Sequence, residues 1–104
     1  MNKSERFDEQ LQNLARFAKI LSHPARLAIL KYLSSAKTRV SGNICASLPL
    51  GRTTISQHLK ELRDSGIIIG QPDGLKVNYR LNPNEIKKTW ICLNFFFKQI
   101  KKNN

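Results

Sequence analysis

The segment between Gly51 and Gly66 constrains the fold of this chain more than any other part of it. Within it, Ile55, Leu59 and Leu62 recur at spacings of four and three residues, which predicts a helix with one apolar side. The two glycines suit its ends, the first as an N-cap and the second as the residue at which the chain leaves the helix. We expect the apolar side to face a core and the other side to face solvent or a partner.

The outward side of this predicted helix carries its charges in an unusual order. Its first half offers small polar and basic side chains and no acid, whereas Glu61 and Asp64 come in the last turns. An ordinary surface helix has acids in its first turn and bases in its last, because these charges interact favourably with the two ends of the helix dipole. The reversed order favours a polyanionic partner, and a helix that reads DNA inserts its N-terminal half into the major groove.

The expected DNA contacts fall into two sets. The first turns of the helix are expected to contact base edges in the major groove. There, the amide of Gln57 would suit adenine, and the guanidinium of Arg52 would suit guanine or a phosphate. The base-reading set is Arg52, Thr53, Ser56 and Gln57. The set expected to bind phosphate, on this helix or on a wing, is Thr54, His58, Lys60, Lys76 and Arg80. His58 lies about 60° off the apolar side, so a hydrogen bond within the domain is an equally good interpretation for it.

The charge of the whole chain indicates the same kind of partner. Its 104 residues include 18 Lys and Arg against 7 Asp and Glu, a net charge of +11, with no acid between Glu9 and Glu61. Such a charge is typical of proteins that bind nucleic acid. No basic amphipathic anchor accompanies the basic stretch, so no membrane partner is expected. The first residues lack the apolar run of a signal peptide, and we therefore expect a cytoplasmic protein.

The remaining helices are predicted from apolar periodicity and from helix-start signals. Residues 5–21 and 83–102 are expected to form the terminal helices. His23 and Pro24 mark the start of a second helix, and a brief third helix follows Ser41. All of this fits a single domain spanning residues 1–104.

Two extended runs, residues 67–71 and 76–81, follow the outward-facing helix and predict a β-hairpin. Pro72-Asp73-Gly74 joins them as the turn, and a further short extended piece is expected at Thr38-Arg39-Val40. The order helix, helix, short helix, outward-facing helix, hairpin, helix predicts a mainly α (α+β) winged helix-turn-helix with about five helices and a two-stranded β-hairpin wing.

Matching apolar stripes run along the two terminal helices. In both, apolar residues step by four and three, a spacing typical of surfaces that pack against another helix. The stripe residues expected at a dimer interface are Leu11, Leu14, Ala18, Ile86, Trp90, Leu93, Phe97 and Ile100. A monomer of this size would leave much of that surface exposed. We therefore expect a homodimer that binds an inverted-repeat operator with half-sites about 34 Å apart.

Three motifs, in order along residues 14–82, resemble those of one known family. Leu-Ser-His-Pro-Ala-Arg-Leu-Ala-Ile-Leu-Lys-Tyr-Leu at 21–33 is similar to the start of the second helix in the arsenical-resistance-repressor family of bacterial regulators. Residues 54–67 resemble the recognition helix of that family, and Tyr79-Arg80-Leu81 resembles the end of its wing. Three motifs in the right order and at the right separations identify a family far more specifically than a single motif does. The resemblance implies a homodimeric repressor of double-stranded DNA whose first and last helices form the dimer interface.

The metal sites of that family have no counterpart in this sequence. Members that sense metals often carry a Cys-x-Cys pair near the third helix, at positions that resemble Val40 and Gly42 here. Others use Asp, His and Glu of the last helix, yet none of these residue types follows Glu85. A metal ion needs several such ligands at fixed distances. We therefore expect no metal site and no cofactor.

Cys45 and Cys92 leave a second interpretation open. Both have apolar neighbours, and free cysteines are mostly buried, so core filling is the favoured role. A repressor that senses thiol oxidation or persulfide through them is the alternative. A further alternative is a winged helix that serves as a protein-interaction module. Acidic residues in the first turns of the outward-facing helix would indicate such a module, and those turns contain none. No catalytic residue is expected, since only two histidines and few acids are available for proton transfer.

Overall fold

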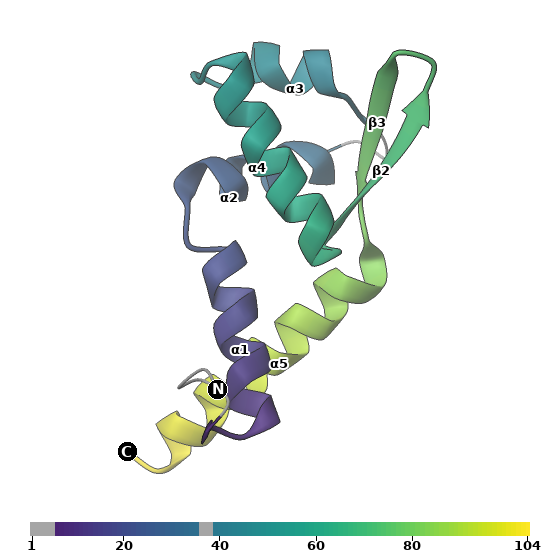
Figure 1. Ribbon diagram of the computed structural model, residues 1–104. Helices are drawn as coiled ribbons and strands as arrows, with labels where there is room; N and C mark the ends of the chain where they lie inside the picture. Colours follow the sequence, from purple (N-terminus) through teal and green to yellow (C-terminus); the bar gives the residue numbers. More distant parts are fainter. Residues whose placement is uncertain (1–5, 36–38) are drawn as a thin grey trace.

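The computed structural model describes residues 6–35 and 39–104. These residues form α1 (Glu9–Ile20), α2 (Pro24–Ser34), β1 (Arg39–Val40), α3 (Ser41–Ser47), α4 (Arg52–Ser65), β2 (Ile68–Asp73), β3 (Lys76–Leu81) and α5 (Pro83–Lys102). Helices α2, α3 and α4 and the strands form the body of the molecule, while α1 and α5 extend together from it (Figure 1). The winged helix-turn-helix predicted from the sequence is confirmed.

Side-chain caps explain where the first two helices begin. Asp8 has an extended backbone and its carboxylate accepts a hydrogen bond from the Leu11 N–H at 2.9 Å, so α1 begins at Glu9, later than predicted. His23 Nδ1 accepts a hydrogen bond from the Ala25 N–H at 3.1 Å, and proline occupies the next position. His23 therefore stands at the start of the second helix, as predicted.

The hairpin closes slightly later than predicted. Asp73 pairs with Lys76, which leaves a two-residue loop of Gly74 and Leu75. Gly74 has a φ of 64°, and a positive φ is what such loops require. Pro72, expected in the turn, lies instead within β2, where a missing N–H is tolerated because β2 is an edge strand.

A third strand joins the hairpin. The sheet has the order β1-β3-β2, and β1 pairs antiparallel with β3 through Arg39 opposite Tyr79 and Val40 opposite Asn78. The extended piece predicted there is confirmed for these two residues, while Thr38 lies outside the described residues. The added strand ties the segment before α3 to the wing.

The core lies between α2, α3, α4 and the sheet. Its buried members are Ile29, Leu33, Ile44, Ile55, Leu59, Leu62, Ile67, Ile68 and Tyr79. The three apolar residues of α4 are at most 1% exposed, so the predicted inward side is confirmed. At the end of α4, Gly66 has a φ of 89°, and its left-handed conformation lets the chain turn directly into β2.

Helix α5 is the longest element, with 20 residues. Its lysines and polar residues interrupt its apolar sequence. No helix within residues 6–35 and 39–104 is both long and apolar enough to cross a membrane.

Candidate nucleic-acid interface

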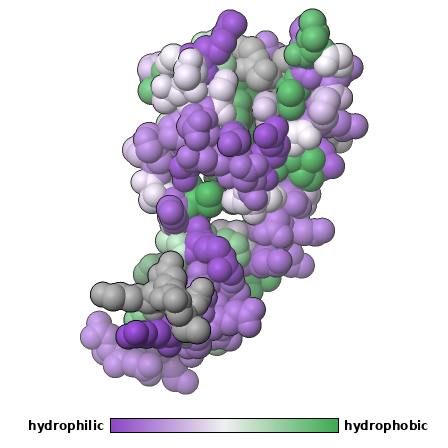
Figure 2. Space-filling view, in the orientation of Figure 1, coloured by the Kyte–Doolittle hydropathy of each residue, from purple (hydrophilic) through white to green (hydrophobic). Residues whose placement is uncertain are grey.

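Burial of one side of α4 determines what the helix presents to the outside. With Ile55, Leu59 and Leu62 in the core, six of the residues predicted to contact DNA are exposed on this helix: Arg52, Thr53, Thr54, Ser56, Gln57 and Lys60. The surface over α4 is mainly hydrophilic in the view of Figure 2. The structure therefore brings these side chains together on one solvent-facing surface, which we call the α4 face.

The start of α4 adds positive partial charge to this face. Its N-cap, Gly51, has no side chain to accept from the first N–H groups, and no acid lies in the first turn. These N–H groups are left for solvent or a ligand, and together with the helix dipole they favour an anion. The backbone at the start of α4 and the side chains of its first turns therefore both favour a negatively charged partner.

The wing also presents its basic side chains outward. On β3, Lys76 and Arg80 are exposed, whereas Tyr79 is buried and Val77 packs against the core. Alternate residues of a strand point to opposite faces, so packing one face leaves the charged face free. Both predicted wing residues are accessible to phosphate.

His58 lies in the interior of the molecule, so its assignment to the phosphate-binding set is wrong. Only 8% of His58 is exposed. Its Nδ1 accepts a hydrogen bond from Arg26 Nε at 3.4 Å, and its ring lies 4.4 Å from that of His23, centroid to centroid. The alternative interpretation, a hydrogen bond within the domain, is the one that the structure supports.

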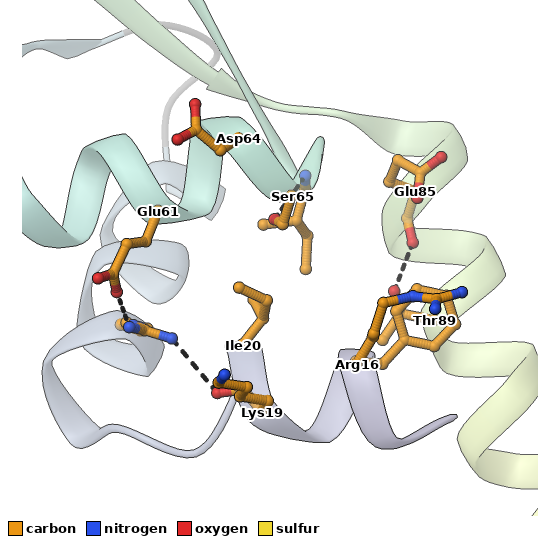
Figure 3. Close-up of a pocket in the computed structure, with 11 residues that line it drawn as sticks. Arg16, Lys19, Ile20, Glu61, Asp64, Ser65, Glu85 and Thr89 are labelled. Carbon is orange, nitrogen blue, oxygen red and sulfur yellow. Dashed lines mark hydrogen bonds and ion pairs between the residues drawn. The ribbon is translucent and has the colours of Figure 1, made fainter. Parts of the chain in front are cut away.

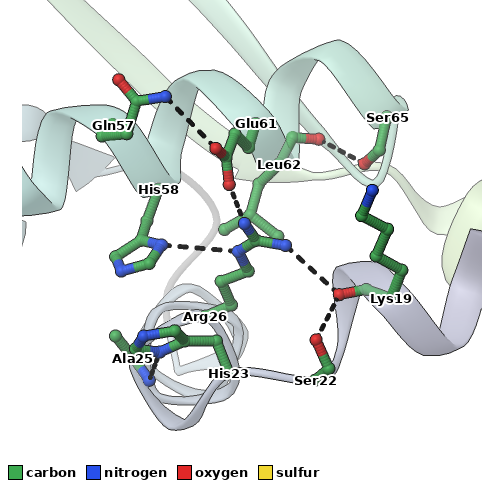
Figure 4. Close-up of polar contacts among 10 residues, drawn as sticks. All are labelled: Lys19, Ser22, His23, Ala25, Arg26, Gln57, His58, Glu61, Leu62 and Ser65. Carbon is green, nitrogen blue, oxygen red and sulfur yellow. Dashed lines mark hydrogen bonds and ion pairs between the residues drawn. The ribbon is translucent and has the colours of Figure 1, made fainter.

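Arg26 is the centre of a polar network that the sequence did not reveal (Figure 4). Besides His58, its guanidinium donates to the backbone oxygen of Lys19 at 3.3 Å and forms an ion pair with Glu61. The network therefore joins the end of α1, the start of α2 and the middle of α4. His58 and Glu61 are each 32 or more residues from Arg26 along the chain, and no local pattern indicates such pairs.

Glu61 connects this network to the α4 face. One carboxylate oxygen, Oε2, pairs with Arg26, and the other, Oε1, accepts a hydrogen bond from Gln57 Nε2 at 3.2 Å. In Figure 4 the amide oxygen of Gln57 points away from Glu61. A residue of the predicted base-reading set is thus hydrogen-bonded to the acid that pairs with Arg26.

A cleft of about 520 Å³ opens behind this network, between α1, the end of α4 and the start of α5 (Figure 3). Its charged lining consists of Arg16, Lys19, Arg26, Glu61, Asp64 and Glu85, three bases and three acids. Phe17, Ile20 and Ile67 supply apolar walls. None of the residues predicted to contact DNA lines the cleft, and its balanced charges give no preference for a polyanion.

The two cysteines lie far apart. Cys45 is on α3, at one end of the molecule in Figure 1, and Cys92 is on α5, which runs from the base of β3 toward the other end; both cysteines are free and partly buried. A disulfide needs Cα atoms within roughly 7 Å, so this arrangement does not allow one between the two within a chain. Cys45 packs against the core, in keeping with the favoured role of core filling. In the described part of the chain, no three His, Cys, Asp or Glu residues cluster as metal ligands would.

A second surface, on α1 and α5, is apolar. Trp90, Phe97 and Ile100 of the predicted stripe are 64%, 59% and 47% exposed, and Leu11 on α1 is 41% exposed. Leu14, Ile86 and Leu93 are partly buried, and Ala18 is exposed. Ile91 and Phe95 on α5, which the stripe did not include, are also exposed, as is Phe7 just before α1. We call the residues of the predicted stripe together the terminal-helix surface.

Comparison with known proteins places this geometry in a family. A sequence profile described as a helix-turn-helix domain matches residues 21–71, which contain α2 to α4 and the start of β2. The arsenical resistance operon repressor of Escherichia coli K12 is 36% identical over 81 residues, covering 71% of this chain and 69% of that protein. The chain belongs to the arsenical-resistance-repressor family of transcriptional regulators.

Solved structures of similar proteins share the fold of this family member. An ArsR-like transcriptional regulator from Rhodococcus sp. RHA1 superimposes with a TM-score of 0.74 at 26% identity, covering 89% of this chain and 87% of that one. The homodimeric winged helix-turn-helix DNA-binding domain of Mb0332 from Mycobacterium bovis gives a TM-score of 0.67 at 24% identity, with 86% and 82% covered. These likenesses support the overall architecture.

Acidification should destabilise this protein through His58. Burial lowers the pKa of His58 below its usual 6.5, and the neighbouring His23 and Arg26 lower it further. The unfolded chain therefore binds a proton that the folded chain resists, so the free energy of unfolding should fall as pH drops below about 6.5 and level off below the folded pKa. Urea denaturation at several pH values between about 7.5 and 5 measures this.

His58→Asn is the matched variant, because an amide oxygen can still accept from Arg26 but does not titrate. Its stability should depend less on pH than that of the wild type. Equal pH dependence in the two proteins would show that His58 does not resist protonation in the fold.

Proposed function

We propose that this chain is a sequence-specific repressor of transcription that acts in the cytoplasm as a homodimer on double-stranded DNA. The observation that carries the proposal is the α4 face: an exposed helix start with basic and small polar side chains, no acid in the first turn and an N-cap without a side chain. A net charge of +11 and two exposed bases on the wing support the same partner. Similarity to the arsenical resistance operon repressor favours repression over activation.

The proposed contacts divide by chemistry. Arg52, Thr53, Ser56 and Gln57 contact base edges in the major groove, where amide and guanidinium groups distinguish base pairs. Thr54, Lys60, Lys76 and Arg80 contact phosphates and set the position of the protein on the duplex. His58 is left out of this set because it is buried.

Dimerisation through the terminal-helix surface would give the operator its form. Burying large apolar side chains is worth roughly 1.5 to 3 kcal/mol each, and several of them together exceed the cost of association. A two-fold axis through this surface would present two α4 faces about 34 Å apart, so the operator would be an inverted repeat with half-sites one helical turn apart. The Mycobacterium bovis domain with the same fold is homodimeric, which supports this arrangement.

Regulation by metal at the positions used elsewhere in the family is not part of the proposal. The positions that resemble the Cys-x-Cys pair hold Val40 and Gly42, and no carboxylate or imidazole follows Glu85. An intrachain disulfide is likewise not expected, because Cys45 lies on α3 at one end of the molecule and α5, which carries Cys92, leads away from it toward the other end (Figure 1). DNA binding would then be set by the abundance of the protein or by a ligand of another kind.

Binding of DNA should depend steeply on salt. If a dimer neutralises about six to ten phosphates, log affinity should fall with log salt with a slope of about −5 to −9. Replacing Lys60, Lys76 or Arg80 with Gln should weaken binding to every sequence and make the slope shallower, since each removes a phosphate contact. Fluorescence anisotropy with a labelled duplex measures both quantities.

Lys102→Gln is the control for charge, because it removes the same charge at the end of α5, far from α4 and the wing. It should change the slope much less than Lys60→Gln does. Affinity that is independent of salt would contradict the assignment to DNA.

Zinc should neither bind tightly nor alter operator affinity, since the positions that hold metal in other family members lack ligands here. The measurement is the zinc content of reduced protein after dialysis, together with anisotropy in chelator and in added zinc. One tightly held zinc per chain that disappears when Cys45 and Cys92 are replaced by Ser would show that a metal site was missed.

Substituting Trp90→Ala together with Phe97→Ala should weaken the dimer and the affinity for DNA together. These side chains are the most exposed members of the predicted stripe on α5, at 64% and 59%, and neither belongs to the α4 face. Sedimentation velocity at micromolar concentration gives the oligomeric state, and anisotropy gives the affinity.

Leu75→Ala serves as the control for loss of exposed apolar surface, because this fully exposed side chain is at the tip of the wing. It should leave the dimer intact. A wild-type monomer, or a double variant that still forms dimers, would rule out the terminal-helix surface as the interface.

A further inference from the structure

The orientation of the Gln57 amide decides what this side chain can recognise. An amide offers an oxygen that accepts and an NH₂ group that donates. Adenine presents a donor and an acceptor in the major groove, so it pairs with an amide that turns both its oxygen and one N–H outward. Guanine presents two acceptors, N7 and O6, and suits an amide that turns only N–H groups outward. The two amide orientations therefore favour different bases.

Glu61 selects between these orientations. A carboxylate only accepts hydrogen bonds, so the group of Gln57 that faces it has to be the NH₂. The contact is 3.2 Å long, from Nε2 of Gln57 to Oε1 of Glu61, and the oxygen of Gln57 points away from Glu61 (Figure 4). One N–H is used by Glu61, and the oxygen and the second N–H remain free. This is the arrangement that complements adenine.

Arg26 holds Glu61 in place for this purpose. Its guanidinium pairs with Oε2 of Glu61 and is itself fixed by contacts to the Lys19 backbone oxygen and to His58. The Arg26 side chain is only 14% exposed, whereas that of Glu61 is 37% exposed, so the pair is anchored on its buried side. A guanidinium only donates, and it keeps an oxygen of residue 61 turned toward itself.

We propose that Glu61, held by Arg26, is a positioning residue that fixes the Gln57 amide for adenine and so determines specificity at one position of each half-site. This inference rests on the proposed function, since it presupposes that Gln57 contacts a base. Glu61, at the edge of the α4 face, would therefore take part in the choice of base. From the sequence, Glu61 was expected to lie away from the N-terminal half of the helix that enters the groove.

The variant Glu61→Gln should reverse the preference. Arg26 would keep the new amide's oxygen as its acceptor, which turns the new NH₂ toward Gln57. The Gln57 amide would then rotate to offer its oxygen inward and its N–H groups outward. We expect wild-type protein to favour adenine over guanine at one position of each half-site by about fivefold or more, and Glu61→Gln to favour guanine there.

The experiment is selection of bound duplexes from a random-sequence pool with wild type, Gln57→Ala, Glu61→Gln and Glu61→Ala, followed by competition binding with duplexes that differ only at the affected position. Gln57→Ala identifies that position by losing its preference. Glu61→Ala should relax the choice between adenine and guanine, because neither amide orientation is then favoured. It also provides a second test should Glu61→Gln fold poorly, which circular dichroism would reveal.

Asp64→Asn is the matched control. It removes the same charge from the same helix, and no contact joins Asp64 to Gln57, so it should strengthen binding to all duplexes alike and leave the base preference unchanged. A reversal or relaxation confined to the Glu61 variants supports the proposal. Adenine retained by both Glu61 variants, at a position that depends on Gln57, overturns it while the proposed function stands. Failure of wild type to enrich any sequence overturns both.

Discussion

Packing of Ile55, Leu59 and Leu62 against α2 and the sheet is the constraint on which the rest of this structure depends. Three fully buried side chains, at roughly 1.5 to 3 kcal/mol each, fix the rotation of α4 about its own axis. A helix rotated by one residue position would expose one of them and bury polar groups instead. The α4 face is therefore a consequence of core packing, and its side chains are presented on a rigid element of the fold.

The polar network around Arg26 complements this packing on the other side of α4. The apolar contacts resist rotation of α4, but its long polar side chains can still adopt several rotamers. Arg26, His58 and Glu61 restrict that freedom by linking α4 to the ends of α1 and α2. The network thus joins the end of α1 and the start of α2 to the helix that carries the α4 face.

The sequence predicted those features that repeat at short range. Spacings of three and four residues identified the stripe of α4, and alternation along residues 76–81 identified the exposed side of the wing. Features that depend on distant partners were not predicted: the pairing of β1 with β3, and Arg26 as the partner of His58. Periodicity gives the angle of a side chain on its helix but not what lies opposite, and for His58 the opposite wall is α2.

The stripe on the terminal helices shows the same limit. Its stepping located Trp90 and Phe97 correctly as exposed apolar residues, yet it omitted Ile91 and Phe95, which are exposed elsewhere on the circumference of α5. A stripe of residues spaced by four and three describes only one side of a helix. A helix that protrudes from the body of the molecule, as α5 does, leaves more of its circumference open (Figure 1).

Methylation interference tests the central claim most directly, because methyl groups on guanine N7 block the major groove and those on adenine N3 block the minor groove. On a duplex enriched by the wild-type protein, a dimer that presents two α4 faces should be blocked by guanine methylation in two clusters, about 10 to 10.5 base pairs apart. Interference confined to adenine N3, or a single cluster of blocked guanines, would contradict the account.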